Sequence, residues 1–179
     1  MMYLRGLWEP AIHSYQLKST ESLHGLWKRV IPLILASGLI FGMSAFFGIG
    51  SEYLSKKMTD LASEEYEMHK ALFVIGQVLW GLVYATLILF IPAVIFWTLT
   101  DLEMDKLIAI QALVLVILLI EHLILIPLNL VAGLAEISSP FSLGVIGQFI
   151  TANEIILYFL AAITLFKIWT IFIQYKYLK

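Results

Sequence analysis

The stretch that decides the fold is Ala71–Thr100, ALFVIGQVLWGLVYATLILFIPAVIFWTLT, which contains no charged residue. As a straight helix these 30 residues would be ~45 Å long, whereas the hydrocarbon core of a bilayer is about 30 Å thick. The sequence therefore predicts a membrane span that tilts, bends or extends beyond the lipid. Pro92 is the expected bend, because proline removes a backbone hydrogen bond inside a helix.

The composition of the whole chain supports a membrane protein. Of 179 residues, 61% are hydrophobic and 13% are charged, whereas soluble domains have roughly 45–50% apolar and about 25% charged residues. The net charge of −2 gives no attraction to nucleic acid. The absence of cysteine excludes disulfides and thiolate metal sites. We expect the lipid bilayer to be the main partner, and we expect no cofactor.

Further apolar stretches predict an all-α, polytopic transmembrane helix bundle over residues 30–179. Its four spans are expected at about 30–50, 71–100, 107–134 and 154–175. Residues 140–152 are apolar but short for a span, so a re-entrant or interfacial helix is expected there. If that segment crossed the bilayer, there would be five spans and the C-terminus would change sides.

Residues 1–29 are predicted to form an amphipathic N-terminal segment. Apolar residues recur there at spacings of three and four, in one set near Trp8 and another near Trp27. These helices would lie in the membrane interface with both tryptophans at headgroup depth. Packing on the end of the bundle is an equal alternative. The segment lacks a signal-peptide pattern, so no cleavage is expected.

The basic residues predict the orientation of the bundle. With four spans, one side holds Arg5, Lys18, Lys28, Arg29, Lys106, Lys176 and Lys179, and the other holds Lys56, Lys57 and Lys70. By the positive-inside rule, both termini are expected in the cytoplasm.

Glu121 is the main candidate for a functional residue, because it lies about 14 residues into the third span. A charge at that depth costs at least ~2.5–3.5 kcal/mol. It could form a proton or cation site with His122 beside it, or it could be a neutral or hydrogen-bonded structural residue. Adjacent helix residues point about 100° apart, so Glu121 and His122 need not share a site.

Lys167 is the second charge expected inside the membrane. At ~1.5 Å per residue, Glu121 would lie ~20 Å from the cytoplasmic face and Lys167 only ~12 Å. We therefore expect Lys167 to reach the near interface and not to pair with Glu121. Outside the membrane, Glu65 and His69 have i, i+4 spacing but lack the second histidine of H-E-x-x-H. A solvated acidic face is expected there, with no metal site.

Gly38 and Gly42 form a G-x-x-x-G pair, which allows a second helix to approach closely. The partner helix could belong to this chain or to a second copy. The chain has no P-loop and no G-x-S-x-G motif. These observations predict helix–helix contacts, no enzymatic activity and no soluble small-molecule substrate.

The C-terminal third resembles the Yip1-domain family of multispan membrane proteins. The resemblance rests on Ser139-Pro140-Phe141-Ser142-Leu143-Gly144, on Leu157-Tyr158 and on Leu165-Phe166-Lys167-Ile168-Trp169. Thr164 stands where that family often has an acid. The resemblance implies an all-α bundle of the bacterial type, in a bacterial plasma membrane. Some bacterial members look like accessory proteins of ABC-type exporters.

Two functions from different classes follow as hypotheses. The first is a non-enzymatic scaffold or accessory subunit that contacts another membrane protein, such as an ABC-type exporter, or a second copy of itself. The alternative is a small proton- or cation-coupled transporter or channel component that uses Glu121. A metal-dependent membrane enzyme is the weakest hypothesis, because the four histidines would lie at different depths.

Overall fold

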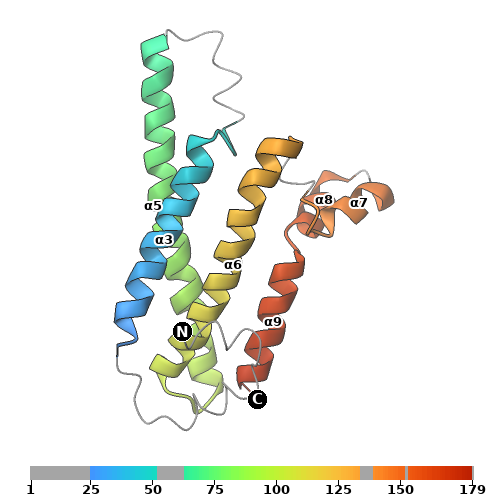
Figure 1. Ribbon diagram of the computed structural model, residues 1–179. Helices are drawn as coiled ribbons and strands as arrows, with labels where there is room; N and C mark the ends of the chain where they lie inside the picture. Colours follow the sequence, from blue (N-terminus) through green and yellow to red (C-terminus); the bar gives the residue numbers. More distant parts are fainter. Residues whose placement is uncertain (1–24, 52–62, 134–138, 152, 179) are drawn as a thin grey trace.

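The computed structural model describes residues 25–51, 63–133, 139–151 and 153–178, and every regular element among them is a helix. The predicted helices around Trp8 lie outside these residues. The helices are α3 (Trp27–Phe46), α5 (Ser63–Leu99), α6 (Met104–Ala132), α7 (Gly144–Ile150), α8 (Glu154–Ala161) and α9 (Leu165–Leu178). Helices α3, α5 and α6 pack side by side, and α9 lies along α6 (Figure 1).

Helix α6 is the centre of the bundle. In its most apolar stretch 72% of the residues are buried, against 33% in α3 and 22% in α5. These three helices are long and apolar enough to cross a membrane, which indicates an integral membrane protein. The large apolar side chains that α3 and α5 leave exposed would be costly in water and suit contact with lipid tails.

Helix α5 begins at Ser63, well before the predicted start at residue 71. Its first turns carry Glu64, Glu65 and Glu67, so the helix continues beyond the apolar stretch into a polar environment. The 30-residue apolar run therefore forms part of a longer helix of 37 residues, with Pro92 inside it. Extension past the lipid accommodates its length.

The predicted span over residues 154–175 is not one continuous helix. The chain forms the short helix α8, leaves helical geometry near Ile163, and then forms α9. Neither α8, with 8 residues, nor α9, with 14, is long enough to cross a bilayer alone. The expected re-entrant or interfacial helix over 140–152 is the seven-residue helix α7, which packs on α8.

Gly38 and Gly42 lie against α5 of the same chain. A Cβ atom added at Gly42 would lie 2.5 Å from Val78 Cγ2, and one at Gly38 would lie 2.9 Å from Leu82 Cδ2. The hydroxyl of Ser37 donates a hydrogen bond of 2.8 Å to the carbonyl of Gly81 across the same contact. The sequence left the partner helix open, and the structure places it within the chain.

The apolar core fills one half of the bundle. We call this half the basic end after Lys28, Arg29, Lys106 and Lys176, and it also carries Asp101, Glu103 and Asp105. The opposite half is called the acidic end after Glu64, Glu65 and Glu67. The basic-end core joins the starts of α3 and α6 to the end of α9, with Val30, Leu107 and Tyr177 each at most 1% exposed.

One polar contact crosses this apolar core. The side-chain amide of Gln174 in α9 donates a hydrogen bond of 2.9 Å to Gln111 Oε1 in α6, and Gln111 is fully buried. The Gln111 Nε2 group has no hydrogen-bond partner among the residues that the structure describes. Hydrogen bonds between membrane helices hold neighbouring helices together, so this pair fixes α9 beside α6.

We expect Gln174→Leu to destabilise the fold by about 1–2 kcal/mol, because it leaves the buried Gln111 amide with no partner at all. The double variant Gln111→Leu/Gln174→Leu should cost less than Gln174→Leu alone, since it removes both polar groups from the core. SDS titration in mixed micelles, followed by circular dichroism, measures both. A double variant that is less stable than the single one would contradict this account.

Candidate functional site

A cavity of about 400 Å³ lies between α3, α5, α6 and the start of α9. Its polar lining residues come from every one of these elements and from the segment before α7: Ser44, Gln77, Tyr84, Glu121, His122, Asn129, Ser139, Thr164 and Lys167. The cavity reaches Gly50 and Asn129 toward the acidic end, and the apolar core occupies the basic end. Such a concentration of polar groups is rare in a bundle that is otherwise apolar.

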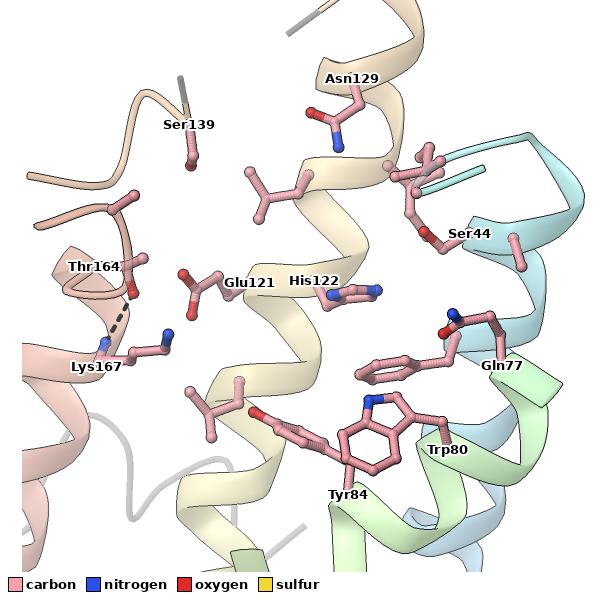
Figure 2. Close-up of a pocket in the computed structure, with 18 residues that line it drawn as sticks. Ser44, Gln77, Trp80, Tyr84, Glu121, His122, Asn129, Ser139, Thr164 and Lys167 are labelled. Carbon is pink, nitrogen blue, oxygen red and sulfur yellow. Dashed lines mark hydrogen bonds between the residues drawn. The ribbon is translucent and has the colours of Figure 1, made fainter. Parts of the chain in front are cut away.

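Glu121 lies on the α6 wall of this cavity and is 6% exposed. Figure 2 shows its carboxylate pointing away from α3 and α5, toward Thr164 and Lys167. Because carboxylate oxygens can only accept hydrogen bonds, an ionised Glu121 requires a cation or a donor here, and a protonated one could donate. The residue therefore suits the binding of a proton or a cation.

His122 lines the same cavity but points to the other side of α6, toward Gln77 (Figure 2). Its ring stacks on Phe41 of α3, with ring centroids 4.4 Å apart and an angle of 7° between the planes. The two neighbours diverge as helical geometry requires. Stacking gives His122 a packing role between α3 and α6.

Lys167 lines the cavity opposite Glu121, and no ion pair joins these two described residues. Its ammonium group donates a hydrogen bond of 2.8 Å to the carbonyl of Ala162. This bond turns the side chain back to the break between α8 and α9. The expectation that Lys167 reaches the near interface stays a prediction.

The break between α8 and α9 is held by a short crossing of two extended segments. Leu143 N–H donates to the Ile163 carbonyl at 3.0 Å, and Leu165 N–H donates to the Phe141 carbonyl at 2.9 Å. Irregular backbone at membrane depth is tolerated where such partners satisfy its polar groups or where it lines a polar cavity. Both conditions hold here, since Thr164 lies in this crossing and in the cavity wall.

Sequence reasoning missed Ser139 and Thr164 as site residues. Thr164 caps α9, because its hydroxyl oxygen accepts a hydrogen bond of 3.3 Å from the backbone N–H of Lys167. The hydroxyl of Ser139 is buried and has no hydrogen-bond partner within the described part of the chain. Thr164 could have been found as a helix-capping residue, because it is a hydroxyl residue directly before the largely apolar start of α9. For Ser139 the sequence offers only its position before Pro140.

Glu65 and His69 lie in the first turns of α5, before the α5 residues that line the cavity. The ring atom Nδ1 of His69 is 2.7 Å from the backbone carbonyl oxygen of Glu65, so the histidine is engaged with the helix itself. Across the described ranges, no group of three or more histidine, aspartate and glutamate residues is placed to hold a metal ion.

Comparison with models of protein families, with characterised proteins and with solved structures gave no match to this chain. The function must therefore be argued from the cavity. Its geometry combines a buried carboxylate, an ammonium group on the facing wall and unwound backbone between two short helices. Broken helices and buried charges of this kind form the binding sites of many membrane transporters.

Proposed function

We propose that this protein is a small proton- or cation-coupled transport component, with Glu121 as the cation-binding residue. The observation that carries the proposal is the burial of this carboxylate in a cavity of about 400 Å³ without an ion-pair partner among the described residues. Retaining such a group costs free energy, and buried intramembrane acids commonly mark ion and proton pathways.

Reconstitution in proteoliposomes tests this proposal. After a pH or cation gradient is imposed, liposomes with the protein should dissipate it faster than protein-free liposomes, and Glu121→Gln should remove the difference. A protein whose flux equals that of protein-free liposomes would overturn the proposal.

The proposed topology has four crossings, with α9 and the α7–α8 hairpin together forming the fourth. Helix α9 runs beside the first half of α6. Helices α7 and α8 lie near the start of α9, at the end away from the C-terminus (Figure 1). The two helices α8 and α9 would span ~12 Å and ~21 Å respectively. The basic end would face the cytoplasm of a bacterial plasma membrane.

Single cysteines test this topology cleanly, because the natural chain has none. We expect Glu67→Cys to react with a membrane-impermeant maleimide in intact cells, and Lys176→Cys to react only after permeabilisation. Both side chains are exposed in the structure, so poor access would not explain a failure to react. Reaction of Lys176→Cys in intact cells would contradict the cytoplasmic placement of the basic end.

The accessory-subunit hypothesis and the resemblance to Yip1-domain proteins both stay predictions. The glycine pair that motivated a helix-packing partner is occupied by α5, so it supports no second protein. Two of the three sequence segments that carry the resemblance, residues 139–144 and 165–169, lie close together. The rings of Phe141 and Phe166 pack with centroids 5.4 Å apart. Recovery of a stoichiometric partner in mild detergent would support the accessory role.

A further inference from the structure

The cavity holds two opposite charges that do not bind each other. Glu121 and Lys167 line facing walls, yet Lys167 Nζ donates to the Ala162 carbonyl at 2.8 Å. In a medium of low dielectric, opposite charges attract strongly at short range. With His122 neutral, the charges of the described lining residues sum to zero, which matches a ligand that carries one charge of each sign.

The wall near Lys167 offers hydrogen-bond donors. The hydroxyl of Ser139 is buried without a partner and points into the space between Ser139 and Glu121 (Figure 2). The Thr164 oxygen accepts from the backbone of Lys167, which leaves its own proton free to donate. Two hydroxyls and an ammonium group suit an oxyanion such as a carboxylate or phosphate.

Glu121 on the α6 wall suits the opposite charge. Its carboxylate points into the cavity toward Thr164 and Lys167. Carboxylates attract organic ammonium groups. Glu121 is the only acid among the described lining residues, so it fixes where the positive group would lie.

We propose that the cavity binds a small zwitterion, with its ammonium group at Glu121 and its oxyanion at Lys167, Thr164 and Ser139. This inference rests on the proposed function of Glu121 as a cation site and adds the ligand class. A volume of about 400 Å³ falls at the small end of ligand sites. A free amino acid and a phosphoethanolamine headgroup of a lipid share this chemistry.

Isothermal titration of the full chain in phosphatidylglycerol nanodiscs tests the ligand class. The probes are L-alanine and glycerophosphoethanolamine, with ethanolamine, propionate and dimethyl phosphate as single-charge analogues. We expect saturable binding of at least one zwitterion and binding at least tenfold weaker for each analogue that shares its groups, because each analogue leaves one buried charge unpaired.

Matched variants test the two walls. Glu121→Gln and Lys167→Met should each weaken zwitterion binding about tenfold or more, and Lys167→Arg should retain most of it. Lys176→Met is the control, because Lys176 lies over the ring of Phe172 and away from the cavity. Size-exclusion profiles establish that each variant folds.

A second experiment, in nanodiscs of phosphatidylethanolamine in place of phosphatidylglycerol, distinguishes a lipid headgroup from a free solute as the source of the zwitterion. Native mass spectrometry that finds this lipid retained by the natural protein and lost from Glu121→Gln would assign the headgroup as the occupant. Binding of free alanine unchanged by the lipid would assign a free solute.

Two outcomes overturn the inference. One is no saturable binding of either zwitterion, and the other is ethanolamine binding as tightly as glycerophosphoethanolamine. The second would leave Glu121 as a simple cation site, so the proposed function would stand while the zwitterion would not. Conversely, zwitterion binding without any gradient-driven flux would contradict the proposed transport and support the ligand.

Discussion

Replacing Glu121 by glutamine should reduce gradient-driven flux through the reconstituted protein to the level of protein-free liposomes. Glutamine keeps the size of the side chain and its capacity for hydrogen bonds, but it carries no ionisable proton. Among the described lining residues no second acid could take over its role. A pH-sensitive dye trapped in the liposomes measures the initial rate after a pH jump.

The matched control for this variant is Glu67→Gln. Glu67 is also on a long helix and also a carboxylate, but it is exposed in the first turns of α5 at the acidic end. Its loss should leave the flux unchanged. If Glu121→Gln transports as fast as the natural protein while remaining folded, the carboxylate is structural and the cavity has no part in coupling.

The three long helices could be predicted because their signal needs no tertiary information. Two of these helices are formed mainly from uncharged runs of twenty or more residues, and the run in α6 is interrupted only by Glu121 and His122. Stretches of this length and hydrophobicity are typical of membrane spans. The division of the fourth predicted span into α8 and α9 could not be predicted, since the break near Ile163 contains no glycine, proline or charge. It is formed by hydrogen bonds to Phe141 and Leu143, about twenty residues earlier in the chain.

Some residues of the candidate site could be predicted from the sequence, and others depend on tertiary contacts. Glu121 could be found because a charge in an apolar run is an anomaly in the sequence itself. The partner of Lys167 could not be found from the sequence, because its hydrogen bond to the Ala162 carbonyl depends on the turn between α8 and α9. Ser139 and Thr164 carry no anomaly, since small hydroxyl residues are common at helix starts. Only the crossing of their two segments brings them to Glu121.

Replacing Gly81 by valine should destabilise the bundle by about 3 kcal/mol, because the crossing of α3 and α5 has no room for a Cβ atom there. That atom would lie 2.8 Å from the backbone oxygen of Ser37 and 3.0 Å from Gly38 Cα. Backbone atoms cannot rotate aside as a side chain does, so the helices must separate. Separation would also break the hydrogen bond from the Ser37 hydroxyl to the Gly81 carbonyl.

Gly76→Ala in the same helix is the control, since a Cβ atom at Gly76 would meet no atom within 4 Å. Alanine also favours the helix by up to about 1 kcal/mol. In an SDS titration, Gly81→Val should therefore unfold at a lower SDS fraction than the natural protein. Gly76→Ala should unfold at an equal or higher SDS fraction. Equal unfolding of the two variants would mean that α3 can leave α5 at little cost. The cavity wall made by Ser44 and Gln77 would then not be fixed, and a preformed site at Glu121 would lose its support.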